Sequence, residues 1–387
     1  MPAMRLRILY IDINPVVSSP ERRLKLIFEH FKKHHCAFMI ARKGEVSSFL
    51  KSTFSLSLPP FNSLKFKRKR GRLWLPEFKA FLSHAQTFFR IYKTARNLEV
   101  DVIHATGFYS AIHAALLGRI KKIPVVWHLV DFWPLRGIPN RIMVKLLLKD
   151  TKKIAISESI KRAFERSGFG RVEVVYGGNI DGFFPEPRKE ARKKLNLPDG
   201  FLVGYSGKIF PGDKKGIKTL LHAFSMLPEK RNAYLVLCGE FVEGYEKNFR
   251  EDVKEAGIDG RVIQFSLPPD KMRYFFSAVD VTVLVSEKEE GLGMSLVESL
   301  ACETPVIGSK AGGIEEVVRD RETGILVPPK DHEALKNALL FMMENPEKRK
   351  KMGKKGREDV LLRFSPERML KRIEEIYHEV LGERGRA

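Results

Sequence analysis

The sequence predicts an α/β protein built from two doubly wound units that follow one another along the chain. Three observations support this fold class. The chain has 387 residues, 43% of them are hydrophobic, and short β-rich runs alternate with helix-period segments from end to end. A chain of this length is expected to form two domains or three. Strands that alternate with helices are typical of parallel sheets covered by helices.

Each half of the chain contributes six expected strands. Those of the first half lie at residues 5–11, 37–41, 100–104, 125–129, 153–156 and 172–176, and those of the second at 202–205, 234–238, 262–265, 281–285, 305–307 and 325–327. Between the halves, Pro185 and Pro187 oppose regular structure and indicate a linker. We therefore expect one domain at residues 1–184 and a second at 185–365.

A last helix is expected at residues 366–387, after the second unit is complete. One face of this helix is apolar, and its members are Met369, Leu370, Ile373, Ile376, Tyr377 and Val380. Such a face must be buried against another element.

Cysteine content and hydropathy bear on the compartment. Cys36, Cys238 and Cys302 are too few and too far apart for a disulfide framework or a cysteine zinc site. The first residues lack an apolar signal core, and no stretch approaches the ~20 apolar residues that cross a bilayer. We expect a cytoplasmic protein, and the sequence leaves open a peripheral attachment to the inner face of the plasma membrane.

The net charge of +22 is confined to one half of the chain. Residues 1–200 hold 38 Lys and Arg against 16 Asp and Glu, whereas residues 201–387 hold 31 of each. Such an asymmetry predicts an anionic partner that contacts the first domain: a membrane surface, a nucleic acid or an acidic substrate.

The strongest local pattern follows the expected strand 281–285. Glu290 lies where this strand ends, and Gly291 to Gly293 lead into a helix that carries Glu298. Ligands of open α/β sheets bind at the carboxyl ends of strands, where glycines allow close approach and amides at the start of a helix hold phosphates or hydroxyls. A carboxylate such as that of Glu298 can accept hydrogen bonds from a vicinal diol.

This pattern resembles the signature of the family 4 glycosyltransferases. The resemblance rests on Glu290, Glu298, the segment Pro305-Val-Ile, and Gly312-Gly-x-x-Glu316, and it covers nearly the full chain. It implies a GT-B fold, in which two Rossmann-like domains face each other across a cleft and the last helix crosses back to the first domain. It also implies a retaining transfer of a sugar from a nucleotide-sugar donor.

The resemblance implies roles for individual residues of the second domain. Glu298 matches the residue that binds the ribose hydroxyls, and Glu290 matches the one beside the transferred sugar. The backbone that would face the sugar or its diphosphate belongs to Gly291, Leu292, Gly293 and Met294.

Three cations are candidates for the donor diphosphate. Lys208 and Lys215 stand where the family has two cations, with Lys208 at a position that usually holds arginine, so the bidentate fork of arginine is lost. Lys214, beside Lys215, is an alternative.

In the first domain, His128 matches the position that approaches the donor sugar, and a core or capping role remains the alternative. His104 fits a structural histidine. Ser19 and Pro20 replace the glycines that the family places near the donor phosphate and the acceptor, so the acceptor side departs from the family pattern.

No Asp-x-Asp motif occurs, so we expect no metal–diphosphate site and no cofactor. The expected activity is a metal-independent transfer from a UDP- or GDP-sugar to a hydroxyl of a lipid-linked or cell-envelope glycan. Lysines and amides at the start of a helix would stabilise the departing diphosphate. Another sugar enzyme of the same fold, an epimerase or a phosphorylase, is the first alternative, and a basic nucleic-acid-binding protein is the second.

A basic segment runs from Lys65 to Arg72 and holds six Lys or Arg in eight residues. At roughly 1 kcal/mol for each basic residue near an anionic leaflet, six could hold the protein at a membrane, whereas a solvated loop is the alternative. No nucleic-acid-binding motif accompanies the charge, so we expect no nucleic acid partner. The helix that follows, at residues 77–96, has an aromatic and apolar face that we expect to pack in the core rather than on a membrane. The members of this face are Phe78, Phe81, Leu82, Ala85, Phe88, Phe89 and Tyr92.

Overall fold

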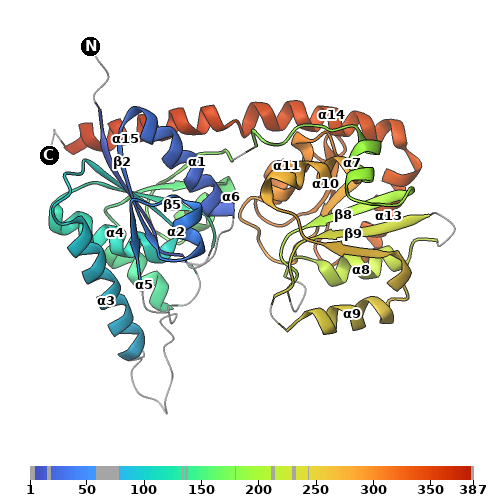
Figure 1. Cartoon of the computed structure of the whole chain (residues 1–387), viewed down its shortest axis with the longest axis horizontal. Helices are drawn as coiled ribbons and strands as arrows, with labels where there is room; N and C mark the ends of the chain where they lie inside the picture. Colours follow the sequence, from blue (N-terminus) through green and yellow to red (C-terminus); the bar gives the residue numbers. More distant parts are fainter. Residues whose placement is uncertain are drawn as a thin grey trace. The chain divides into compact units, whose positions relative to one another are not determined.

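The computed structural model divides into two compact units, which Figure 1 draws with their helices and strands labelled. Unit 1 comprises Met1–Val175 and Glu367–Ala387, and unit 2 comprises Tyr176–Pro366. The residues that the structure describes are 5–14, 19–57, 78–132, 135, 138–178, 180–210, 214–228, 232–242 and 244–384. The basic segment from Lys65 to Arg72 lies outside them, as do residues 15–18 of the expected acceptor loop.

Unit 1 contains a parallel sheet of seven strands in the order β3-β2-β1-β4-β5-β6-β7. The strands are β1 (Arg7–Asp12), β2 (Cys36–Arg42), β3 (Phe54–Leu56), β4 (Val102–Thr106), β5 (Val125–Leu129), β6 (Lys152–Ala155) and β7 (Val172–Val174). The helices are α1 (Ser19–His34), α2 (Glu45–Phe49), α3 (Phe78–Ala95), α4 (Phe108–Lys121), α5 (Ile138–Leu147), α6 (Glu158–Arg166) and α15 (Pro366–Arg384). The strand order reverses beside β1, which is the topology of a doubly wound unit.

Unit 2 contains a second parallel sheet, with six strands in the order β10-β9-β8-β11-β12-β13. The strands are β8 (Phe201–Ser206), β9 (Ala233–Cys238), β10 (Val262–Phe265), β11 (Val281–Leu284), β12 (Val306–Ser309) and β13 (Gly324–Val327). The helices are α7 (Arg188–Lys194), α8 (Ile217–Ser225), α9 (Glu246–Glu255), α10 (Met272–Ala278), α11 (Met294–Ala301), α12 (Ile314–Val317), α13 (His332–Glu344) and α14 (Pro346–Arg363).

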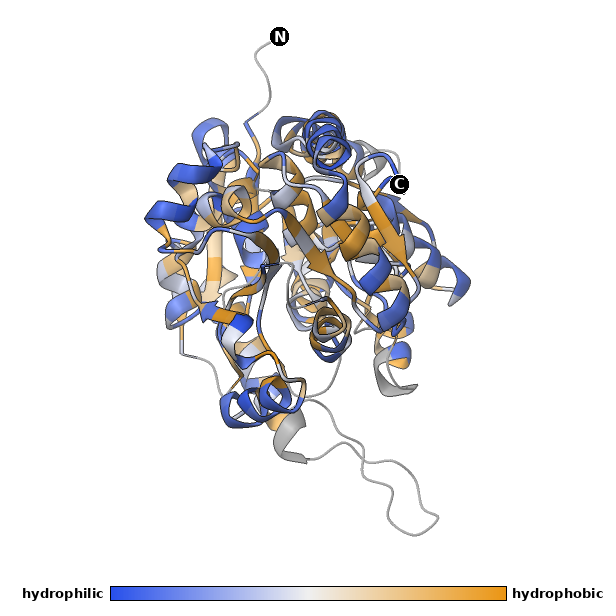
Figure 2. Ribbon diagram, turned by 90° about the vertical axis from the view of Figure 1, so that its right-hand side faces the viewer, coloured by the Kyte–Doolittle hydropathy of each residue, from blue (hydrophilic) through white to orange (hydrophobic). Residues whose placement is uncertain are grey.

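The two sheets confirm the predicted fold class of two Rossmann-like units. Each of the twelve expected strands corresponds to an observed one, and the short edge strand β3 was not expected. Figure 2 shows hydrophobic colouring concentrated in the strands, as expected for parallel sheets covered on both faces.

The division between the units falls after Val175, whereas the sequence placed it after residue 184. The reason is that the intervening segment is held by unit 2. The Tyr176 hydroxyl donates to the Glu316 carboxylate at 2.7 Å, and the Glu186 amide donates to the Ser277 hydroxyl at 3.0 Å. The two prolines therefore belong to the start of unit 2.

Helix α15 belongs to unit 1, as the resemblance implied, and its apolar face is buried there. All six residues of that face lie in one buried cluster with residues of β1, β4 and α1, and Figure 1 shows α15 beside the unit 1 sheet. Arg372 and Lys152 form ion pairs that tie the exposed side of α15 to the sheet through Glu173 and Glu379.

The prediction for the aromatic face of α3 was wrong for Leu82, Ala85 and Phe89. Leu82 and Phe89 are 41% and 66% exposed, and Ala85 is exposed as well. The helix packs on α4 through its histidine side, because the His84 ring stacks on His113 at a centroid distance of 5.5 Å. Leu82, Ala85 and Phe89 therefore face outward, whereas Phe88 stacks on His113 and Ile91 is fully buried.

We predict that Ile373→Ala lowers the free energy of unfolding of unit 1 by about 2–5 kcal/mol, because it opens a cavity in the buried cluster. Trp74, Trp127 and Trp133 all belong to unit 1, so tryptophan fluorescence in urea reports this unit. The exposed neighbour Lys371→Ala serves as the control, with a change below about 0.5 kcal/mol. An unchanged urea midpoint for Ile373→Ala would show that α15 does not stabilise unit 1.

Candidate functional site

The candidate donor site of unit 2 lies at the carboxyl ends of β8 and β11, the edge at which open α/β sheets bind ligands. Glu290 follows β11, and α11 begins four residues later, directly after Gly293. Lys208 follows β8, and Lys215 precedes α8. The structure therefore places these sequence-predicted residues at one edge of one sheet.

Lys215 reaches Glu290 because Gly216 lies directly against the end of β11. Gly216 has a φ of 73°, in the left-handed region that favours glycine. A Cβ atom at this position would lie 2.0 Å from the carbonyl oxygen of Val285, so no other residue fits. The Lys215 ammonium forms an ion pair with the Glu290 carboxylate, and the Ser286 hydroxyl donates to the same carboxylate at 3.3 Å.

The Glu290 backbone is fixed by two further glycines. The Gly313 amide donates to the Glu290 carbonyl at 2.9 Å, and Gly312 forms a bridge with Glu290. A Cβ atom at Gly313 would lie 2.3 Å from the carbonyl oxygen of Gly291. The Gly312-Gly313 pair of the sequence pattern is therefore required for close approach of two backbone segments.

The segment from Gly291 to Met294 forms the entry to α11. Gly293 caps the helix with a φ of 82°, and Leu292 is buried beneath the turn. The first turn of a helix leaves amides without intrahelical partners and carries partial positive charge, so this entry can accept an anion or a hydroxyl. Met294 lies against Gly178, where a Cβ atom would come within 2.4 Å of its methyl carbon.

Glu298 is buried in the second turn of α11 and is only 7% exposed. A solvated helix face therefore does not explain this carboxylate. Burial raises the pKa of the neighbouring Cys302 thiol to about 12, and the charge of Glu298 adds to the effect.

The two other candidate cations are not drawn into the contact with Glu290. Lys208 is exposed, and its carbonyl accepts a hydrogen bond from the Tyr205 hydroxyl at 3.0 Å. Lys214 is exposed and lies over the Phe210 ring at 5.9 Å. The structure thus separates Lys215 from both.

In unit 1, His128 is buried near the carboxyl end of β5. Its Nε2 atom has no hydrogen-bond partner among the described residues. Burial holds the pKa of His128 well below its ordinary value, and the neighbouring His104 and Arg23 lower it further. His128 is therefore neutral near pH 7. Its Nε2 atom can donate or accept one hydrogen bond with a ligand hydroxyl, according to the tautomer.

His104 has the structural environment that the sequence suggested. Its Nδ1 atom shares a hydrogen bond of 2.7 Å with the Tyr377 hydroxyl of α15, which also donates to Tyr10 at 3.3 Å. Burial lowers the pKa of His104 to about 3.

The sequence reasoning missed a buried polar cluster around the end of β1. Asp12 ends β1, and Asn14 joins it to Glu21 of α1, because the Asn14 amide donates to Asp12 at 3.0 Å and its side chain donates to Glu21 at 2.9 Å. Burial and the nearby Glu21 raise the pKa of Asp12 well above its ordinary value. Burial also lowers the pKa of Arg23 to about 10. The sequence signal that could have predicted this cluster is the aspartate at the carboxyl end of the first strand, where ligands of α/β sheets bind.

The described residues contain neither a metal-type cluster nor a membrane-spanning helix. No three His, Cys, Asp or Glu side chains in the described ranges lie together as a metal site would require. Within the same ranges, no helix is long and apolar enough to cross a membrane.

Two family models match the chain, one in each half. "Glycosyltransferase Family 4" matches residues 36–179, and "Glycosyl transferases group 1" matches residues 187–359. Among curated proteins, the lipopolysaccharide 1,2-N-acetylglucosaminetransferase of Salmonella typhimurium is 31% identical over 58% of this chain and 61% of its own. An uncharacterized glycosyltransferase of Methanocaldococcus jannaschii is 27% identical over 79% of this chain and 84% of its own.

The matched region spans 43% to 61% of the length of the curated relatives that are 28–33% identical to the chain. Two solved structures share the fold over almost the whole chain. HepE from Anabaena, in complex with UDP and glucose, has a TM-score of 0.82 at 23% identity and covers 97% of this chain and 100% of its own. Sucrose-phosphate synthase from Thermosynechococcus elongatus has a TM-score of 0.81 at 22% identity and covers 98% and 100%.

We predict that Gly313→Ala destabilises unit 2 by about 1–3 kcal/mol, because the added methyl group overlaps the Gly291 carbonyl. Its φ of −66° suits alanine, so the steric overlap alone is tested. Gly260→Ala is the matched control, since a Cβ atom there meets nothing within 4 Å. Thermal unfolding followed by circular dichroism measures both variants, and equal melting temperatures would contradict the close approach.

We also predict a pH dependence that originates at His104. Below its unfolded pKa of about 6.5 the unfolded chain binds a proton that the folded unit does not, so stability falls as the pH falls. For each such histidine, the free energy of unfolding falls by about 1.4 kcal/mol per pH unit as the pH falls from roughly 6 to 3.5. His104→Gln should reduce this slope by that amount in urea titrations, and an unchanged slope would show that His104 is protonated in the folded unit.

Proposed function

Because this chain carries the two domains of the family 4 glycosyltransferases, we propose that it transfers a sugar from a nucleotide-sugar donor to a hydroxyl of a glycan or lipid-linked acceptor. The transfer proceeds with retention at the anomeric carbon and without a metal ion. The observation that carries the proposal is the contact of Lys215 with Glu290 beside the entry of α11, which gathers a cation, a carboxylate and helix amides.

The donor diphosphate is the expected ligand of Lys215 and of the α11 entry. A diphosphate carries more negative charge than the single carboxylate of Glu290, so it competes for the Lys215 ammonium and releases Glu290 toward the sugar. As the bond to the anomeric carbon breaks, charge develops on the departing phosphate, where Lys215, Lys208 and the helix amides stabilise it.

The other donor contacts follow from the burial of two residues. Glu298, buried on α11, accepts hydrogen bonds from the ribose hydroxyls. Neutral His128 offers its free ring nitrogen to a hydroxyl of the transferred sugar. The departing phosphate helps to deprotonate the acceptor hydroxyl, so no enzyme nucleophile is required. The UDP complex of HepE supports a nucleoside diphosphate as the leaving group.

A membrane-bound or cell-envelope acceptor is supported by two features. The name of the Salmonella typhimurium relative specifies lipopolysaccharide as its substrate. Unit 1 holds 38 Lys and Arg against 17 Asp and Glu, a net charge of +21, and the sequences of α3, α4 and α5 contain no acidic residue. An anionic lipid surface complements such a unit.

The function is tested with a panel of UDP-, GDP- and ADP-sugars. The cognate donor should raise the melting temperature, because binding to the folded state stabilises it. Nucleoside diphosphate should then be released from that donor only when an acceptor is supplied. Release without an acceptor, or interconversion of two sugars on the nucleotide, would contradict a transferase.

Two substitutions separate the roles of the carboxylates. Glu298→Ala should raise the KM for the donor by about 10- to 100-fold, as expected for the loss of hydrogen bonds to a charged group. Glu290→Ala should chiefly lower kcat, by about 100-fold or more. Glu289→Ala is the control, because Glu289 is exposed beside Glu290 and forms no hydrogen bond or ion pair with the described residues. Full activity in both variants would contradict the assignment.

A further inference from the structure

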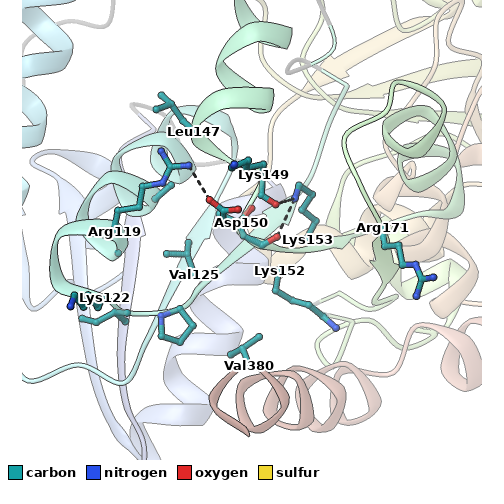
Figure 3. Close-up of a pocket in the computed structure, with 15 residues that line it drawn as sticks. Arg119, Lys122, Val125, Leu147, Lys149, Asp150, Lys152, Lys153, Arg171 and Val380 are labelled. Atoms are coloured by element: carbon teal, nitrogen blue, oxygen red, sulfur yellow. Dashed lines mark hydrogen bonds and ion pairs between the residues drawn. The ribbon is translucent and has the colours of Figure 1, made fainter. Parts of the chain in front are cut away.

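A cationic pocket lies at the amino-terminal edge of the unit 1 sheet. Its volume is about 590 Å³, within the range of small-molecule sites. The lining includes the starts of β5 and β6, the residue before β7, the end of α4, and one residue of α15. Figure 3 shows Arg119 and Lys122 on one side of the pocket and Arg171 on the other.

This pocket is separate from the edge that carries His128. Val125 begins β5 and lines the pocket, whereas His128 lies three residues further along the same strand. At about 3.3 Å per residue, the strand separates the two by roughly 10 Å. A ligand of the pocket therefore does not occupy the proposed sugar site.

The lining holds six cations and a single carboxylate. The cations are Arg119, Lys122, Lys149, Lys152, Lys153 and Arg171, and the carboxylate is Asp150. Asp150 is engaged by Arg119 at 3.2 Å, and Lys152 pairs with Glu173 at 3.0 Å, outside the lining. Within the described part of the chain, Lys122, Lys149 and Arg171 have no ion pair, so their charges are not offset.

Lys153 adds a buried positive charge to the same pocket. The residue is 4% exposed, and its ammonium donates to the carbonyls of Lys149 and Thr151, each at 3.1 Å (Figure 3). These two bonds leave a third donor on the ammonium, and no carboxylate accepts from it in the described residues. A buried cation held by carbonyls alone is costly, and an anion in the pocket would offset this cost.

We infer that this pocket binds a phosphoryl group through Lys122, Lys149, Lys153 and Arg171. A phosphoryl group carries up to two charges and several acceptor oxygens, which suits dispersed lysines together with the fork of a guanidinium. Two sources supply this chemistry: a free phosphate or diphosphate, and the headgroup of an anionic phospholipid.

The surface beside the pocket allows the two sources to be distinguished. Helix α5 ends at Leu147, which lines the pocket, and exposes Ile142 and Leu146 to 51% and 62%. Exposed apolar side chains among Arg141, Lys145 and Lys149 are typical of helices that lie in a lipid interface. A lipid headgroup would use these apolar residues, and a free phosphate would not.

The test compares three variants of the full chain with the parent. The pocket variant is Lys122→Gln, Lys149→Gln and Arg171→Gln. The control variant is Lys43→Gln, Lys51→Gln and Arg162→Gln, which removes the same charges from unit 1 outside the pocket. Lys51 and Lys122 both have positive φ, 47° and 52°, so the backbone cost is matched. The third variant is Ile142→Ser with Leu146→Ser.

Pyrophosphate binding is measured by titration calorimetry in a Lys215→Ala background, which weakens the proposed diphosphate site of unit 2. Vesicle binding is measured by flotation with phosphatidylglycerol and phosphatidylcholine at 30:70. If the pocket variant alone loses pyrophosphate affinity at least tenfold, the ligand of the pocket is a free phosphate or diphosphate. If the pocket variant and the α5 variant (Ile142→Ser with Leu146→Ser) both lose vesicle binding tenfold and the control variant does not, the ligand of the pocket is a lipid headgroup.

The inference is overturned if the pocket variant keeps both affinities, or if the control variant loses as much as the pocket variant. The second result would show diffuse charge rather than a site. Acceptor-dependent sugar transfer is measured separately with soluble substrates, so failure of the pocket and failure of the proposed function are distinguishable.

Discussion

The candidate donor site depends on the close approach of backbone segments at glycine positions. Gly216 lies against the Val285 carbonyl at the end of β11, and Gly313 lies against the Gly291 carbonyl. These contacts fix the residue before α8 and the turn before α11, and they bring Lys215 to Glu290. A side chain at either glycine would separate the two segments. The glycines of the sequence pattern are therefore structural requirements of the contact between Lys215 and Glu290.

In unit 1, burial is the main cause of the shifted pKa values of the polar groups near the carboxyl ends of the strands. His104 and His128 are kept neutral by burial, and Asp12 has a raised pKa for the same reason. Neutral groups at the carboxyl ends of strands suit hydroxyl ligands. The excess positive charge of this unit lies elsewhere, in a cationic pocket at the opposite edge of the sheet and in helices without acidic residues. The buried His128 and the cationic pocket therefore lie toward opposite edges of the unit 1 sheet.

The sequence was sufficient for the fold because its signals are local, and the roles of the donor residues stay predictions. Strands of a parallel sheet are short apolar runs, and the Glu290 pattern lies within one strand–turn–helix unit. Predictions that depended on long-range packing were less successful. His84 and Phe88 of α3 stack on His113 of α4, whereas Phe89 is exposed, and the segment after Val175 is held in unit 2 by the Tyr176–Glu316 bond, which joins residues 140 positions apart. The cationic pocket likewise combines α4, β6 and the residue before β7, so no local spacing in the sequence predicts it.

The central claim is that Lys215, held against Glu290, binds the diphosphate of a nucleotide sugar. The most direct measurement is the affinity of UDP, GDP and ADP for the parent, for Lys215→Gln and for Lys214→Gln, by titration calorimetry. Lys214 is an adjacent exposed lysine, so the pair differs only in position. The account predicts that Lys215→Gln lowers the affinity for the cognate nucleoside diphosphate at least tenfold. The affinity of Lys214→Gln should stay near that of the parent. Equal losses, or none in either variant, would contradict it.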